Sequence, residues 1–293
     1  LTPSLPGTTV SVSKEAAGSA DDRDVIFQGD PARPNTAWLL KKPTTAEGVK
    51  ILPVKNAGLF TAQVFQSLAK SRGITLSGPE FTSSLQPKHI LAIHESRPLW
   101  QIAETIFATS DNVMTELVLL HLAKAITSKP QSLKESAAYL ESSVKRSLPN
   151  IDWNGFHLDN GSGLTPNNRI SAEQLLAVLL YTDQISGGIE RLLPVGGWTQ
   201  GLQNRFTHPN QAFRVVAKSG GIFYSTTLCG FLYSASGRRF AFAILVSDLD
   251  KRKMYDQSSD EKNTRKKVYE AQRWMKQGTE YLDSIVSGWI DKY

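Results

Sequence analysis

The chain has little that would support a disulfide, metal-binding or membrane-spanning class of protein. Its 293 residues contain a single cysteine, Cys229, so no internal disulfide and no paired-cysteine metal site can form. The five histidines are scattered and no HExxH motif occurs, so we predict no metal and no cofactor. No apolar run approaches the roughly 20 residues that a transmembrane helix needs, and we predict no transmembrane segment.

The composition is otherwise that of a folded globular protein, with 40% hydrophobic and 20% charged residues. The formal net charge is +6, and much of the excess lies in KRK at 251–253 and TRKK at 264–267. No nucleic-acid-binding module accompanies these basic runs, so we expect no nucleic-acid partner. An ordinary basic surface explains them, and an anionic wall polymer suits such a surface. The opening LTPSLPGTT lacks the basic start and apolar core of a signal peptide, which fits a mature or truncated chain as well as a cytosolic one.

One candidate motif is Ser110-Asp111-Asn112, which precedes the apolar stretch VMTELVLLHLAKAI. The pattern predicts a largely buried helix, with Ser110 or Asp111 as its N-cap. A serine hydroxyl can relay a proton, and an asparagine carboxamide two residues on can bond a substrate amide. A lone Ser-x-Asn is a weak signal, because it occurs by chance about once in a chain of this length.

A second candidate motif is Lys218-Ser219-Gly220, which follows the strand-like FRVVAK. Two further strand patterns come after it, joined by a hairpin signal at Ser236-Gly237, so we expect the motif to end the first of three antiparallel strands. A fixed cation and a hydroxyl can hold a substrate carboxylate, and glycine allows close approach of a ligand backbone. The next amide can then face a developing oxyanion.

The sequence around both motifs resembles one known family. The stretches ATSDNVMTELVLLHL, DNGSGLTPNNRIS and RVVAKSGGIFYSTTLCGFLYSASGRRFAFAILV are similar, in this order, to the D-alanyl-D-alanine carboxypeptidase/endopeptidase family. These are the class C low-molecular-mass penicillin-binding proteins, and the resemblance covers roughly residues 55 to 250. It implies an α/β (α+β) β-lactamase/transpeptidase-like fold, in which helices cover an antiparallel sheet.

The resemblance implies roles for six residues at the matching positions. Ser110 is similar to the proton-relay serine and Asn112 to the substrate-binding asparagine. Lys218 and Ser219 resemble the strand pair that holds the terminal carboxylate of the substrate, with Gly220 beside them. Gly221 stands where a backbone N–H forms half of the oxyanion hole. The family usually has threonine at Ser219 and aspartate at Asn160, and a different run at Trp198–Leu202.

The nucleophilic element of that family, a Ser-x-x-Lys at the start of a buried helix, is not found in a suitable setting. Four matches to the bare spacing begin at Ser11, Ser67, Ser142 and Ser259, in a strand-like stretch, a helix interior, a polar helix and a hydrophilic loop. We therefore expect the nucleophile upstream of this chain. Residues 1–52 then form the end of an inserted β-rich domain, and residues 53–293 form the C-terminal part of the penicillin-binding domain.

The sequence thus predicts a serine-type D-Ala-D-Ala carboxypeptidase or endopeptidase that acts on peptidoglycan through an acyl-enzyme, with this chain alone inactive. Its expected partners are muropeptides ending in D-Ala-D-Ala, with β-lactams as inhibitors, in the periplasm or another extracytoplasmic compartment. A non-catalytic relative that binds peptidoglycan or a protein partner remains an alternative, and a β-lactamase is a further one. The oligomeric state and the bond cleaved stay open.

Overall fold

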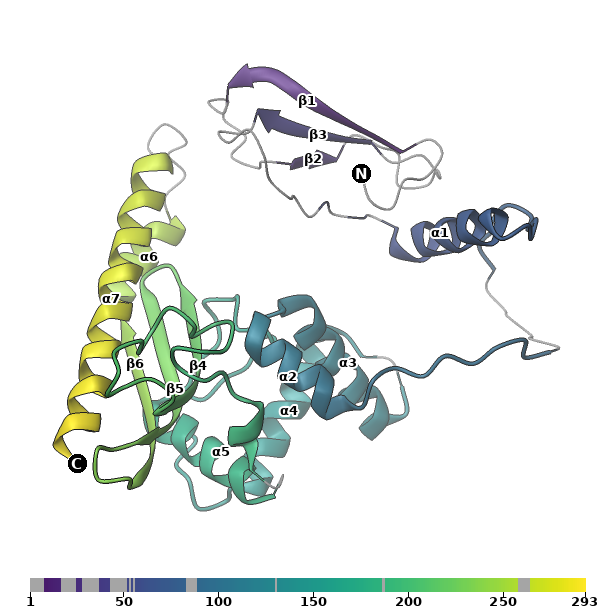
Figure 1. Cartoon of the computed structure of the whole chain (residues 1–293). Coiled ribbons are helices and arrows are strands. Elements are labelled where there is room, and N and C mark those ends of the chain that lie inside the picture. Colours follow the sequence, from purple (N-terminus) through teal and green to yellow (C-terminus); the bar gives the residue numbers. More distant parts are fainter. Residues whose placement is uncertain are drawn as a thin grey trace. The chain divides into compact units, whose positions relative to one another are not determined.

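The computed structural model describes residues 8–16, 25–27, 37–42, 52, 54, 56–82, 89–129, 131–185, 188–257 and 264–293. Its contacts divide the chain into two compact units, residues 1–94 and 95–293. The predicted boundary between residues 52 and 53 stays a prediction. Each unit is described by itself (Figure 1).

The first unit holds a three-stranded sheet and one helix. The strands are β1 (Thr9–Ala16), β2 (Val25–Phe27) and β3 (Ala37–Lys42). Strand β3 lies in the middle, parallel to β1 and antiparallel to β2. Trp38 of β3 is almost fully buried. Helix α1 (Ala57–Ser71) begins at Asn56, whose side chain accepts the Leu59 N–H at 3.1 Å.

The second unit is built on an antiparallel sheet of three strands in the order β4-β5-β6: β4 (Val215–Ile222), β5 (Ser225–Tyr233) and β6 (Arg239–Ser247). Its helical elements are α2 (Leu99–Thr109), α3 (Asn112–Thr127), α4 (Leu133–Ser147), α5 (Ala172–Ile185), the 3₁₀ helix η1 (Ile189–Leu192), α6 (Leu249–Gln257) and α7 (Thr264–Lys292). The predicted hairpin at Ser236-Gly237 is confirmed, since these residues join β5 to β6 and Gly237 has a φ of 81°.

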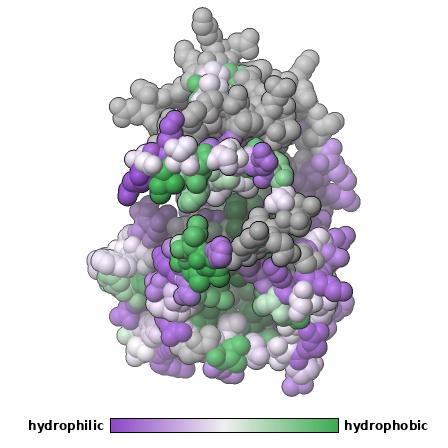
Figure 2. Space-filling model, turned by 90° about the vertical axis from the view of Figure 1, so that its right-hand side faces the viewer, coloured by the Kyte–Doolittle hydropathy of each residue, from purple (hydrophilic) through white to green (hydrophobic). Residues whose placement is uncertain are grey.

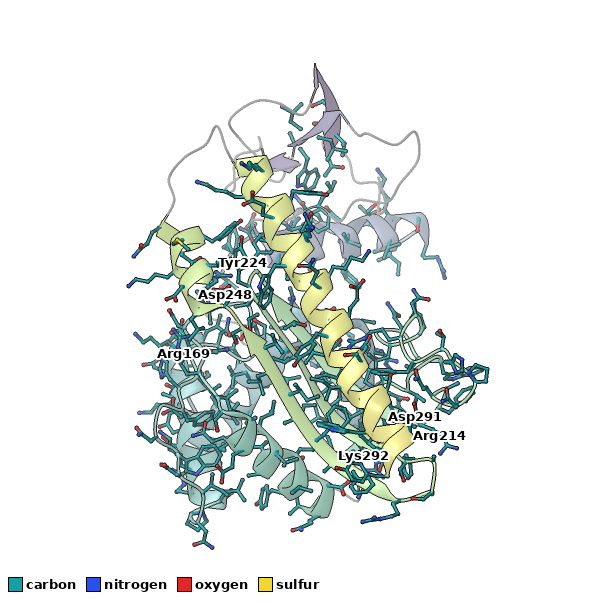
Figure 3. All side chains as sticks on the ribbon, turned by 90° about the vertical axis from the view of Figure 1, so that its left-hand side faces the viewer. Arg169, Arg214, Tyr224, Asp248, Asp291 and Lys292 are labelled. Carbon is teal, nitrogen blue, oxygen red and sulfur yellow. The ribbon has the colours of Figure 1, made fainter. Side chains whose placement is uncertain are left out.

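The sheet is buried on both faces because helices cover each of them. Alternate residues of β4 point to opposite faces, so Val215 and Ala217 pack with Leu282 and Val286 of α7. Val216, between them, packs on the other face with Leu179 of α5. Figure 3 shows α7 lying along the sheet, with Arg214, Asp291 and Lys292 near its C-terminal end.

The β4–β5 hairpin is held by the start of α6. The turn consists of Phe223 and Tyr224, and Tyr224 has a φ of 63°. The Asp248 N–H donates to the Tyr224 carbonyl at 2.9 Å, and these two residues lie together in Figure 3. None of the helices in the described part of the chain is both long and apolar enough to cross a membrane.

Candidate active site at the Ser-x-Asn turn and strand β4

Ser110 is the first of the two residues, Ser110 and Asp111, that form the corner between α2 and α3. It has left-handed backbone angles, φ 54° and ψ 44°, and its N–H closes α2 on the Ile106 carbonyl at 2.8 Å. The N-cap of α3 is Asp111, whose carboxylate accepts the Met114 N–H at 2.9 Å. Of the two caps that the sequence allows, the structure therefore uses Asp111, which leaves the Ser110 hydroxyl for another partner.

That partner is Lys218, 108 positions further along the chain. Its ammonium group donates a hydrogen bond to Ser110 Oγ and a second one, of 2.9 Å, to the carbonyl of Ser219. Burial lowers the pKa of the Lys218 ammonium below its ordinary value, because desolvation disfavours the charged form. The two motifs that the sequence singles out thus meet in one place.

Strand β4 continues past the lysine motif, contrary to the expectation that the motif ends the strand. It extends to Ile222, and Gly220 lies opposite Thr227 of β5. A Cβ atom on Gly220 would lie 2.7 Å from Thr227 Oγ1, so the glycine is required by the neighbouring strand. A Cβ atom on Gly221 would lie 3.0 Å from Cε of Met275 in α7.

The outer edge of β4 is open beyond Ala217 in the described part of the chain. The Ala217 N–H donates to the Pro194 carbonyl at 2.9 Å, and the Val215 carbonyl accepts the Gly196 N–H at 2.8 Å. Because backbone groups alternate along a strand, the N–H groups of Ser219 and Gly221 point to this same edge. An extended ligand could add here as a further strand. The side chain of Ser219 lies on the face opposite to that of Lys218.

Asn112 is the first residue of α3 and is half-buried. Four residues on, and on the same side of the helix, the Glu116 carboxylate accepts the N–H groups of Gly161 at 3.0 Å and Ser162 at 3.1 Å. This carboxylate therefore attaches the glycine-rich loop around Gly161 and Ser162 to α3. The sequence reading missed Glu116, although its spacing from Asn112 places it on the same helix face.

This loop, residues 159–168, is shaped by side-chain bonds to its own backbone. Asn160 Oδ1 accepts the Gly163 N–H at 3.1 Å, and Asn168 Oδ1 accepts the Asp159 N–H at 2.7 Å. A Cβ atom on Gly161 would lie 3.1 Å from the buried side chain of Leu119, so this glycine lets the loop pack directly on α3.

Three of the four Ser-x-x-Lys spacings lie where the sequence places them, away from the start of a buried helix. Ser11 lies in β1 and Ser67 in the interior of α1. Ser142 is exposed in the polar helix α4, where Lys145 pairs with Glu141 at 2.7 Å. The match that begins at Ser259 lies outside the described residues. Within the described residues, no cluster of three His, Cys, Asp or Glu side chains could hold a metal ion.

Comparison with known proteins assigns the chain to a family. Residues 39–268 match the D-Ala-D-Ala carboxypeptidase 3 (S13) family, so the chain belongs to this family, as its motifs indicate. Carboxypeptidase Rv3627c of Mycobacterium tuberculosis is 30% identical over 195 residues, which are 62% of this chain and 41% of that protein. The D-alanyl-D-alanine carboxypeptidase DacB of Haemophilus influenzae is 24% identical over 199 residues, 66% of this chain and 41% of that protein. The chain thus spans less than half the length of these curated relatives.

A solved structure supports the fold. Penicillin-binding protein 4 (dacB) of Haemophilus influenzae, in complex with a novel β-lactam, matches with a TM-score of 0.66 and 21% identity, over 83% of this chain and 56% of that chain. The predicted mixed α/β architecture, a transpeptidase/β-lactamase-like fold with helices on an antiparallel sheet, is confirmed.

Proposed function

We propose that this chain supplies two walls of the active site of a serine-type D-Ala-D-Ala carboxypeptidase or endopeptidase that cleaves peptidoglycan peptides through an acyl-enzyme. The observation that carries the proposal is the hydrogen bond from Lys218 to Ser110 Oγ. It joins a fixed cation to a hydroxyl at the corner of two helices, and both hold positions that the family motifs require.

In the proposed reaction, a serine nucleophile on a segment outside this chain attacks the carbonyl of the penultimate D-Ala. Ser110 relays a proton to the leaving amine of the terminal D-Ala, and Lys218 provides the positive charge that favours this relay. The carboxylate of the leaving residue lies against Lys218 and Ser219. The carboxamide of Asn112 bonds a substrate amide, and the N–H of Gly221 stabilises the oxyanion. Water then releases the acyl group from the nucleophile.

Uncovered apolar side chains beside Ser110 support a further segment at this place. Val113, three residues from Ser110, is 70% exposed, and Leu117, one turn further along α3, is exposed as well. Figure 2 shows hydrophobic side chains at the surface of the face that it presents. Large apolar side chains exposed next to candidate catalytic groups are typical of a face that another element covers. The nucleophile-bearing helix suits this position.

The setting follows from the substrate. Peptidoglycan lies outside the cytoplasmic membrane, so the proposed enzyme works in the periplasm or an equivalent compartment. β-Lactams, which mimic acyl-D-Ala-D-Ala, would acylate the same nucleophile. The non-catalytic alternative is favoured by one observation, namely that no Ser-x-x-Lys in the described residues begins a buried helix.

The test is labelling with a fluorescent penicillin, followed by denaturing electrophoresis. We expect no covalent label on the 293-residue chain and a labelled band for the natural full-length protein, mapping to a Ser-x-x-Lys outside this chain. A label that maps to Ser11, Ser67, Ser142 or Ser259 would contradict the proposed placement of the nucleophile. An unlabelled full-length protein would favour the non-catalytic alternative.

A variant then tests the assigned cation. In the full-length protein, Lys218→Ala should lower kcat/KM for a D-Ala-D-Ala peptide about 30- to 1000-fold, which corresponds to about 2–4 kcal/mol of transition-state binding. Lys276→Ala is the matched control, because Lys276 is an exposed lysine on α7 that should not change kcat/KM. Unchanged kcat/KM in Lys218→Ala would refute the role of this residue.

A further inference from the structure

The segment between η1 and β4 has an unusual surface. Over the 19 residues 195–213 it carries one charged side chain, Arg205, whereas a stretch of this length at the chain's average of 20% charged residues would carry about four. The exposed residues of the segment are aromatic, amide, hydroxyl, glycine, proline or histidine: Trp198, Gln200, Gly201, Gln203, Asn204, Thr207, His208, Pro209, Asn210 and Phe213. In a chain of net charge +6, the segment's own exposed residues form a neutral patch, which borders the exposed carboxylate of Asp291, where Asn210 Nδ2 donates to Oδ1 at 3.0 Å.

The arginines at this segment are directed inward. The guanidinium of Arg205 donates from Nε to the carboxylate of Asp283 on α7 at 3.1 Å. Arg214, at the end of the segment, donates to the Ser234 carbonyl at 2.7 Å. Because both arginine side chains bond to internal partners, they are not directed at a ligand on this surface.

Two aromatic side chains dominate the patch. Trp198 is 71% exposed and Phe213 is 60% exposed, and their ring centroids lie 5.9 Å apart at an interplanar angle of 50°. Phe213 has a φ of 65°, a conformation that bulky residues rarely adopt, and its N–H is held by the Gly196 carbonyl at 3.1 Å. A bulky residue kept in a strained conformation with its ring in solvent is typical of a functional position.

The patch lies in a segment that joins the two elements of the candidate active site. The Gly196 N–H donates to the carbonyl of Val215 in β4, three residues before Lys218. At its other side, a Cβ atom on Gly201 would lie 3.0 Å from the Ala108 carbonyl of α2, two residues before Ser110. A ligand on the patch therefore rests on backbone that is fixed to both walls of the site.

We propose that the Trp198–Phe213 patch binds an uncharged, N-acetylated sugar chain. Sugar rings have apolar C–H faces that stack on aromatic rings, and amphipathic rings such as indole suit such mixed surfaces. Carboxamides such as Gln200, Gln203 and Asn204 both donate and accept, which matches hydroxyl and acetamido groups. That this sugar is the glycan part of peptidoglycan rests on the proposed function. That the patch binds such a sugar does not rest on it.

The test is isothermal titration of the full chain with tetra-N-acetyl-chitotetraose. Two comparison sugars define the chemistry: the glucosamine tetramer, which is cationic, and maltotetraose, which lacks acetamido groups. We expect binding of the acetylated tetramer and at least about tenfold weaker binding of either comparison sugar. No binding of the acetylated sugar at about 10 mM, or equal binding of all three, would overturn the proposal.

Variants locate the binding on this surface. Trp198→Ala should weaken binding of the acetylated tetramer at least about tenfold, and Trp198→Phe should restore it to within about threefold of the wild type. Trp100→Ala, which removes a tryptophan of α2 that is 52% exposed, is the matched control and should leave binding unchanged. A Trp100 variant that weakens binding as much as Trp198→Ala would refute the location.

Two further measurements distinguish sugar binding from coverage of the patch by a protein segment and from the proposed catalysis. The fluorescence of Trp198 is obtained as the difference between the wild type and Trp198→Phe, and in the full-length protein acrylamide should quench it. If Trp198 is shielded from acrylamide, another protein segment covers the patch, and the sugar-binding proposal is overturned. Lys218→Ala should bind the sugar as the wild type does. A full-length protein that takes no penicillin label but still binds the sugar would count against the proposed catalysis alone.

Discussion

The two hydrogen bonds of the Glu116 carboxylate lead to a prediction about how the site is held together. Hydrogen bonds to a charged group contribute about 1.5–3 kcal/mol each, so removing both carries an upper cost of about 3–6 kcal/mol. Glu116 and Ser162 are half-buried, and water can replace part of the interaction. We therefore expect Glu116→Ala to lower the free energy of unfolding by about 2–4 kcal/mol.

The conservative variant sharpens this estimate. Glu116→Gln keeps one carbonyl oxygen for the N–H of Gly161 or of Ser162, but turns an amide donor toward the other N–H. It should therefore lose about half as much stability, about 1–2 kcal/mol. Glu173→Ala is the matched control, an exposed glutamate in the first turn of α5, and its effect should stay within about 0.5 kcal/mol.

Two assays measure the effect of the Glu116 hydrogen bonds: urea unfolding of the full chain, and amide hydrogen exchange followed by NMR. The N–H groups of Gly161 and Ser162 should be protected in the wild type, and Glu116→Ala should lower their protection factors by about 30- to 1000-fold. If their exchange rates and the unfolding midpoint match those of Glu173→Ala, the bonds contribute nothing and the reasoning is wrong.

Three further predictions follow from other parts of the second unit. Burial lowers the pKa of Lys218 in the folded state below its unfolded value, so the unfolded state binds more protons between these two values and stability should rise with pH toward about 10.4. Lys218→Met should lack this rise when unfolding free energies are measured from about pH 7 to 10. Parallel curves for the variant and the wild type would contradict the prediction. Burial raises the pKa of the Cys229 thiol to about 12, so a thiol reagent at about pH 8 should label Cys229 only after denaturation, and equal native labelling would refute its burial. A Cβ atom on Gly230 would lie 2.2 Å from the Val216 carbonyl oxygen, so Gly230→Ala should lower the free energy of unfolding by about 3 kcal/mol or more. Gly288 in α7 has open space around it, so Gly288→Ala should raise the free energy of unfolding by about 0.5–1 kcal/mol in the same assay.

The meeting of the two motifs could be predicted, whereas the local backbone that makes it possible could not. Sequence order and flanking patterns placed Ser110 at a helix end and Lys218 on a strand, and the structure confirms both. The cap was ambiguous, because serine and aspartate are both good N-caps. The decision depends on where α2 ends, and α2 ends at Ser110 in a left-handed conformation that glycine usually occupies.

Two other features depend on contacts that are distant in sequence. A pair of glycines normally weakens a strand, and the strand was expected to end at the lysine motif. Strand β4 nevertheless continues to Ile222, because Gly220, Gly221 and Ile222 pair with Thr227, Thr226 and Ser225 of β5. Glu116 was missed for a similar reason, since its partners Gly161 and Ser162 lie 45 and 46 residues away. Local patterns contain no information about such pairs.

The division of the chain between His94 and Glu95 has a consequence for engineering and for evolution. Ser110, Lys218, Glu116 and the neutral aromatic patch all lie on one side of it, and the bonds that orient them involve residues 95–293 alone. The preceding residues can therefore diverge, or be exchanged between relatives, without altering the distance between the Ser110 hydroxyl and the Lys218 ammonium group.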